Sequence, residues 1–299
     1  MASDKAAWQW CNNPGMISNM TLRTLLLASL AALASAGAAP AAAQDIVVKA
    51  PQQLDPPKAR RFVGQVSRAV DGQLVRLREP VCPAVIGLKD ESARAIERRI
   101  GELARSVGAK VAADTYCQHN LVVMFPANAN TFMAEARARR PAWFEGLGRA
   151  EVERIAGTGA VRSWALTSLR NDDGQDPPAT GFRFGGRSMI VRDASILRRS
   201  TLRQVEMSFL LIEHIEAEGL TVNQLAAYAL MRGLTRTDVP LESPAPTILT
   251  LFDPTVGQEE PDLTTADRAF LTALYESDPR DDALRVRARI AAKLVRPTP

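Results

Sequence analysis

Side chains suited to acid–base or metal chemistry are scarce in this chain, which has 2 His and 3 Cys among 299 residues. His214 stands in the segment Glu213-His214-Ile215-Glu216-Ala217-Glu218. Alternate residues of a strand share one face, so this polar cluster of Glu213, His214, Glu216 and Glu218 could present nitrogen and oxygen ligands to a metal. The simpler interpretation, which we favour, is the polar side of an edge strand that holds no metal.

Motifs of the common catalytic classes are absent from the sequence. It contains no G-x-S-x-G elbow, no Ser-x-x-Lys pair and no P-loop. Gly157 and Gly159 begin a Gly-rich turn without the third glycine of a dinucleotide-binding loop. The carboxylate pairs Asp172-Asp173 and Glu259-Glu260 fall in loops, which gives glycosidase chemistry little support. We expect no cofactor.

The N-terminal part has the layout of a cleavable signal peptide over about residues 20–43. Arg23 supplies positive charge, Leu25–Leu33 an apolar run, and Ala41-Ala42-Ala43 a small-residue cleavage site. The apolar run is far shorter than the roughly 20 residues that span a bilayer. We expect cleavage before Gln44, a periplasmic or secreted product, and no stable membrane anchor after cleavage.

Residues 1–19 make a poor signal-peptide start, and we expect natural translation to begin at Met16 or Met20. Cys11 precedes the apolar run, so no cysteine stands at the cleavage site for a lipid anchor. The product keeps Cys82 and Cys117, which an oxidising compartment favours as a structural disulfide worth about 3–4 kcal/mol. Without a C-x-x-C motif, neither a thiol oxidoreductase nor a zinc knuckle is supported. His119 is expected to be a loop residue beside this disulfide.

Charge does not point to nucleic acid. The whole chain carries 37 basic and 33 acidic residues, a net charge of +4. Short basic clusters such as Arg137–Arg140 lack interleaved aromatic residues. We expect no nucleic-acid partner, and a partner among the proteins or polymers of the cell envelope.

Periodicity predicts the elements of one α+β domain over residues 58–299, after an extended Pro-containing leader over 44–57. Helices are predicted over 57–70, 90–107, 131–139 and 149–156. Strands are predicted over 73–78, 84–88, 121–125 and 161–169, and 187–196 with 201–215 as a hairpin or neighbouring strands. We expect a mixed sheet packed with helices. A helix over 281–295 is expected to pack on the domain surface.

The segment Leu220–Leu234 carries strong helix signals. Thr221 and Gln224 form a capping box. Val222, Leu225, Ala229 and Gly233 make the predicted buried stripe, and Gly233 suits the C-terminal end. A second capping box, Thr264 with Asp267, opens a helix that reaches Tyr275.

This helix, the segment Thr247–Asp253 and the pattern Leu263-Thr264-x-x-Asp267 before Leu274-Tyr275 together resemble the end of a zincin metalloprotease domain of the metzincin type. The resemblance is closer to exported bacterial families of unknown function with a degenerate zincin helix. It implies a zincin-like C-terminal half over about residues 200–280.

An active zincin needs H-E-x-x-H, because positions i and i+4 of a helix can hold one zinc while the Glu acts as general base. Alignment on Gly233 places Ala226 and Leu230 at the ligand positions and Ala227 at the base position. A shifted alignment offers Gln224 and Tyr228, with Leu225 as the base. Neither set binds zinc, and two distant histidines are too few for a catalytic site.

The sequence therefore predicts an exported, zincin-like protein without catalysis or bound metal. It would act by binding or as a structural component of the cell envelope. The alternative is a hydrolase with an unrecognised site near His214.

Overall fold

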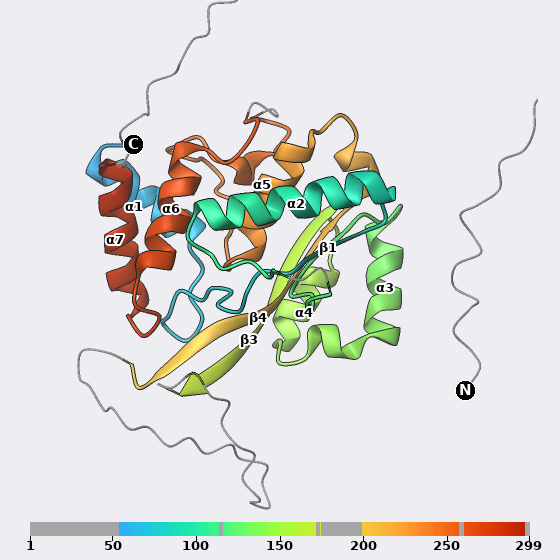
Figure 1. The fold of residues 1–299 in the computed structure, drawn as a ribbon, viewed down its shortest axis with the longest axis horizontal. Coiled ribbons are helices and arrows are strands. Elements are labelled where there is room, and N and C mark those ends of the chain that lie inside the picture. The colour runs from blue at the N-terminus through green and yellow to red at the C-terminus, as the bar shows by residue number, and fades with distance from the viewer. Residues whose placement is uncertain (1–53, 114–115, 172–173, 175–198, 257–259, 297–299) are drawn as a thin grey trace, which may run out of the picture. The chain divides into compact units, whose positions relative to one another are not determined.

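A mixed sheet forms the centre of the fold, with the strand order β1-β2-β4-β3. The computed structural model describes residues 54–113, 116–171, 174, 199–256 and 260–296. The strands are β1 (Pro83–Ile86), β2 (Leu121–Met124), β3 (Val161–Asn171) and β4 (Thr201–Ile212). β1, β2 and β4 run parallel, and β3 pairs antiparallel with β4 at one edge (Figure 1).

Helices cover both faces of this sheet, which explains the continuous apolar run of β2. Leu121 and Val123 face the larger core, while Val122 and Met124 face a second core. The alternation of side chains along a strand thus buries all four residues. The α+β class predicted from the sequence is confirmed.

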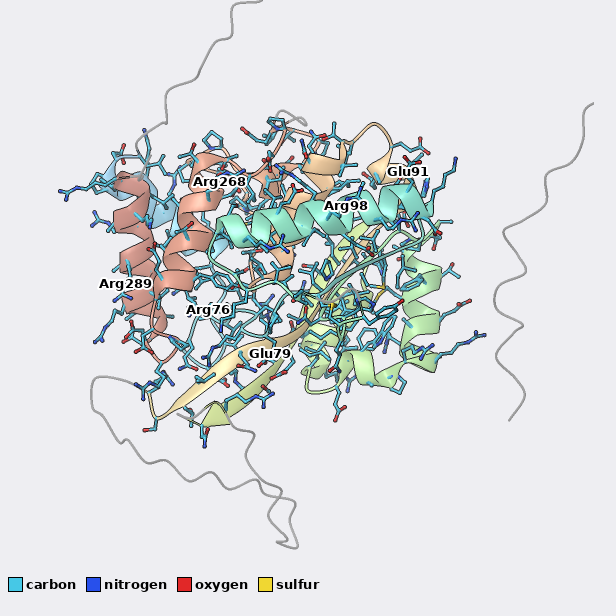
Figure 2. All side chains as sticks on the ribbon, viewed as in Figure 1. Arg76, Glu79, Glu91, Arg98, Arg268 and Arg289 are labelled. Carbon is cyan, nitrogen blue, oxygen red and sulfur yellow. A yellow bond between two sulfur atoms is a disulfide. The ribbon has the colours of Figure 1, made fainter. Side chains whose placement is uncertain are left out.

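The larger core is covered by α1 (Pro56–Val66), α2 (Asp90–Ser106), α5 (Val222–Gly233), α6 (Thr265–Glu276) and α7 (Ala283–Val295). α2 packs against α5, and α7 packs against both α1 and α6 (Figure 1). The predicted stripe of α2 is buried at Ala93, Ile96, Ile100 and Leu103. Its opposite face is exposed, as Glu91 and Arg98 illustrate in Figure 2.

The second core lies under α3 (Ala129–Arg139), the 3-10 turn η1 (Pro141–Phe144) and α4 (Arg149–Ala156). Trp164 of β3 stacks between Phe144 and Phe209, with ring centroids 5.5 Å and 4.9 Å away. Two further 3-10 turns are η2 (His214–Ala217) and η3 (Ile248–Thr250).

Several predicted boundaries need correction. The first helix ends at Val66 rather than 70, where Ser67 hydrogen-bonds the Val63 carbonyl, and it begins at Pro56, inside the predicted leader. Residues 73–78 form no strand, only isolated bridges such as Arg76 with Thr235.

The partner of β4 was also not foreseen. β4 pairs with β3 and β2, while the proposed hairpin partner 187–196 lies outside the described residues. The signal-peptide segment and Cys11 lie outside them as well. Within the part of the chain that is described, no helix is both long and apolar enough to cross a membrane.

Candidate functional site

Helix α5 is the element on which the sequence placed a degenerate metal motif. Its capping box forms as predicted, with Thr221 Oγ1 accepting from the Gln224 backbone and Gln224 Oε1 accepting from the Thr221 backbone. Leu225, Ala229 and Gly233 of the predicted stripe are buried, but Val222 is 36% exposed. Burial is also not one-sided, because residues 224–231 are all buried. The helix lies between other elements and is covered on nearly every side.

The degenerate motif positions lie in the core and not in a cleft. Ala226, Ala227 and Leu230 are completely buried in the larger core. Gly233 faces Leu121 of β2, whose Cγ would lie 2.9 Å from an added Cβ. This face of α5 packs against the core, so it offers no open coordination position for a metal ion.

A different face of α5 lines an open cavity of about 400 Å³. Tyr228 and Arg232, four residues apart, come from the helix. The β3 strand begins beside them, and the 3-10 turn η2 contributes Glu216. Apart from Tyr228, Arg232 and Glu216, the lining includes Val161, Phe252 and Asp253.

Tyr228 is the most unusual group in this cavity. The residue is 2% exposed, and its ring meets Phe252 edge-on, with centroids 4.8 Å apart. Among the described residues none hydrogen-bonds its hydroxyl. Burial raises the pKa of Tyr228, so the phenol stays protonated at neutral pH and can donate.

Arg232 lies one turn further along the same face. Its Nη1 donates to the Thr237 carbonyl and its Nη2 to Ser163 Oγ of β3. Its Nε is buried and has no partner in the described part of the chain. Buried donors are normally paired, so this N–H has unused capacity for an acceptor.

The surroundings of Arg232 are rich in arginine. A neighbouring hollow is lined by Arg232 together with Arg68, Arg154 and Arg236. Glu151 forms ion pairs with both Arg154 and Arg236. Asp238 Oδ1 lies 3.7 Å from Arg68 Nη1. Burial lowers the pKa of Arg236, which the charge of Glu151 opposes. Four cations against two carboxylates make this hollow electropositive.

The polar cluster around His214 is not on an edge strand, so that interpretation is wrong. β4 ends at Ile212, is central in the sheet, and passes into η2. Glu213 Oε1 accepts a 2.7 Å hydrogen bond from the Ala129 backbone at the start of α3. The side chain of His214 is 53% exposed, and its Nδ1 lies 4.0 Å from Glu218 Oε1. Of the cluster, only Glu216 lines the cavity over α5.

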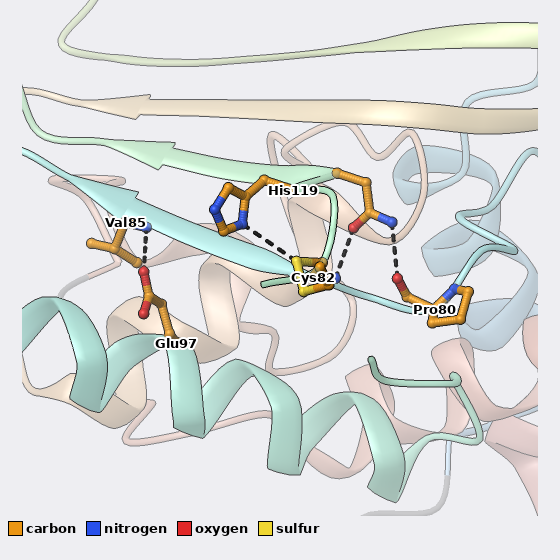
Figure 3. Close-up of a disulfide and its surroundings, with 7 residues drawn as sticks. Pro80, Cys82, Val85, Glu97 and His119 are labelled. Carbon is orange, nitrogen blue, oxygen red and sulfur yellow. Dashed lines mark hydrogen bonds between the residues drawn. A yellow bond between two sulfur atoms is a disulfide. The ribbon is translucent and has the colours of Figure 1, made fainter. Parts of the chain in front are cut away.

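The predicted disulfide between Cys82 and Cys117 is present. It joins the segments that lead into β1 and β2, and His119 lies next to it, as expected (Figure 3). These three residues form the single group of His, Cys and carboxylate side chains within the described ranges whose ligand atoms are close enough for a metal.

Sequence reasoning therefore missed Arg232 and gave Tyr228 only as a poor zinc ligand. The available signal was the i, i+4, i+8 spacing of Gln224, Tyr228 and Arg232 along a mostly apolar helix. Comparison of the chain with models of known families, with curated proteins and with solved structures found no match.

Proposed function

We propose that this protein is exported and acts by binding, without catalysis, through the cavity over α5. The observation that carries the proposal is that Tyr228 and Arg232, four residues apart on α5, line this cavity together with Phe252, while the Tyr228 hydroxyl and Arg232 Nε have no hydrogen-bond partner among the described residues. The zincin-like resemblance remains part of this proposal. It is compatible with apolar residues at the buried positions Ala226, Ala227 and Leu230.

The ligand that fits these groups has a carboxylate and an apolar body. Two donors, one of them charged, suit an anionic oxygen. Val161, Leu249 and Phe252 offer apolar contact. A cavity of about 400 Å³ is within the size range of small-ligand sites. We therefore propose that the partner is a protein of the cell envelope that inserts an apolar chain end with a free carboxylate.

The test uses random tetrapeptides, one library with free C-terminal carboxylates and one amidated. We expect the protein to retain peptides with an apolar final residue from the free library and none from the amidated one. Tyr228→Phe should weaken retention of the best peptide about 5- to 10-fold, the value of one hydrogen bond.

Tyr275→Phe is the matched control. The Tyr275 hydroxyl donates to the Leu77 carbonyl at 2.8 Å, so this variant should lose about 1 kcal/mol of stability and keep peptide affinity. Equal retention of both libraries would refute the carboxylate site. Cleavage of the peptides that a chelator abolishes would refute the absence of catalysis.

A hydrolase near His214 is the second candidate, and one observation favours it: Glu216, two residues away, lines the same cavity. If this function is correct, a processed protein should hydrolyse some peptide or ester in a broad substrate panel. His214→Ala and Glu216→Gln should then each abolish that activity with unchanged circular dichroism. A neutral effect of His214→Ala on an observed activity would reject this candidate.

A further inference from the structure

Cys82, Cys117 and His119 lie at one end of the β1–β2 pair, away from the residues of the cavity over α5. Their sulfur and nitrogen ligand atoms all lie within 4.8 Å of one another. His119 Nδ1 is 3.3 Å from Cys82 Sγ, and the two sulfurs are bonded (Figure 3). A tetrahedral zinc at ~2.3 Å from sulfur and ~2.0 Å from nitrogen needs ligand atoms roughly 3.3–3.8 Å apart.

Hydrogen bonds of Asn120, the residue after His119, hold the Cys82 segment beside the segment of Cys117 and His119 independently of the disulfide. Asn120 Oδ1 accepts from the Cys82 backbone at 2.8 Å, and Asn120 Nδ2 donates to the Pro80 carbonyl at 2.9 Å. The Asn120 backbone N–H in turn donates to the Cys82 carbonyl at 3.1 Å. Opening the S–S bond removes none of these contacts, so the three side chains stay at the same end of two paired strands.

The site also has access to solvent. Cys82 is buried, but Cys117 is half-buried and His119 is exposed. Cavities of about 520 Å³ and 600 Å³ are both lined by Cys117 and His119. A reductant can reach Cys117, and a water can complete the coordination of a metal ion.

We propose that the dithiol form of this protein binds one thiophilic d10 cation such as Zn²⁺ through Cys82 Sγ, Cys117 Sγ and His119 Nδ1. Two thiolates and an imidazole are the donor set that such ions prefer over harder cations. The disulfide and the metal are alternative occupants of one site, so the redox state decides whether metal binds.

The chemistry balances with a dithiol as the reductant. A thiolate of the reductant attacks Cys117 Sγ, the Cys82–Cys117 bond breaks, and Cys82 leaves as a thiolate. The second thiol of the reductant then displaces Cys117, and the reductant becomes a disulfide. Two electrons and two protons have passed to the protein. Zn²⁺ binding releases the two thiol protons to solvent.

The test uses the full chain in a Cys11→Ser background, reduced with a phosphine and titrated anaerobically with Co²⁺. We expect one Co²⁺ per chain, with thiolate-to-cobalt charge-transfer bands and the visible bands of tetrahedral cobalt. The oxidised chain should show none. Zn²⁺ should displace the cobalt. It should raise the Tm of the reduced protein and leave the Tm of the oxidised protein unchanged.

Variants separate this site from fortuitous binding. Cys82→Ser and Cys117→Ser should each abolish the charge-transfer bands, and His119→Ala should weaken cobalt binding about 10-fold or more. His214→Ala, which removes the other histidine, should bind like the reference chain. Equal cobalt binding by His119→Ala would overturn the assignment. So would a reduced chain that unfolds by circular dichroism and does not refold with Zn²⁺.

Discussion

At the scale of single residues, the carboxylate of Asp267 links two segments of the C-terminal region by hydrogen bonds. It is fully buried, and Oδ1 accepts from Thr247 Oγ1 at 2.6 Å. Oδ2 accepts from the backbone N–H groups of Ile248 at 2.8 Å and Thr264 at 3.1 Å. The side chain thus ties η3 to the start of α6, which explains why the sequence segments around them lie together.

Replacing Asp267 by Asn should destabilise the protein by about 2–3 kcal/mol. The amide nitrogen cannot accept, so it would leave the donors of Ile248 and Thr264 unpaired in the core. Urea unfolding measures the change. Asp90→Asn, whose side chain is 90% exposed, is the control and should change stability by less than about 0.5 kcal/mol. Equal effects of the two variants would contradict the role of Asp267.

Two helical glycines give a matched comparison. A Cβ on Gly233 would overlap Leu121, whereas one on Gly64 in α1 would meet no atom within 4 Å. We expect Gly233→Ala to destabilise by about 1–3 kcal/mol through overpacking, and Gly64→Ala to stabilise by up to about 1 kcal/mol through helix propensity. Thermal unfolding of the two single variants measures both changes in stability. Leu121→Ala combined with Gly233→Ala should give less than the sum of the single losses, and strict additivity would argue against the overlap.

At the scale of elements, β1 is an edge strand whose outer side is protected. Pro83 has no backbone N–H, and the Val85 N–H donates to Glu97 Oε1 of α2 at 2.8 Å (Figure 3). Such features prevent pairing with another chain at a sheet edge.

Glu97→Ala should therefore cost about 1–2 kcal/mol and increase self-association at high protein concentration. Glu102→Ala is the matched control on the same helix. Its carboxylate is 60% exposed and pairs with Arg99 near the surface, so its loss should cost less than about 1 kcal/mol and leave self-association unchanged. Sedimentation velocity and urea unfolding of both variants test this, and identical behaviour would reject the protective role.

The environment of Glu206 in the β3–β4 pair should make the stability of the protein depend on pH. Burial raises the pKa of Glu206, but hydrogen bonds from Ser168, Arg170 and Gln204 and the charge of Arg170 outweigh it, so the pKa is lowered overall. The stabilisation by ionised Glu206 is therefore present above its unfolded-state pKa of about 4.3. It is lost as the pH falls through the lower pKa that Glu206 has in the folded protein.

Glu206→Gln removes this contribution. We expect a loss of about 1 kcal/mol at neutral pH, which shrinks towards zero as the pH is lowered below about 4. The stability difference is measured from the unfolding free energies of both proteins between about pH 3 and about pH 7. A difference that grows on acidification would contradict the direction of the pKa shift.

At the scale of the whole molecule, the proposed export can be tested by the mass of the mature chain. We expect the exported protein to begin at Gln44, because signal peptidases cut after small residues at the two alanines Ala41 and Ala43. Ala43→Leu should leave the precursor uncut, whereas Ala34→Leu, immediately after the apolar run, should still be cleaved. Intact mass of the envelope fraction gives the answer, and a full-length chain found there would reject the cleavage.

The sequence by itself determined the features that depend on neighbouring residues. Helix periodicity, the capping boxes of Thr221 and Thr264, the short apolar run of β2 and the pairing of the two remaining cysteines were all predicted. Each follows from local backbone geometry, side-chain alternation or simple counting.

Only the tertiary structure decided which faces meet. The place of β4 between β2 and β3, the burial of α5 around Ala226 and Leu230, and the approach of Glu213 to α3 all join segments distant in sequence. Long-range packing overrides local pattern at these positions, since an apolar helix enclosed by other elements leaves no periodic polar face to detect. The cavity formed by Tyr228, Arg232 and Phe252 exists for the same reason: its walls come from separate elements that only folding brings together.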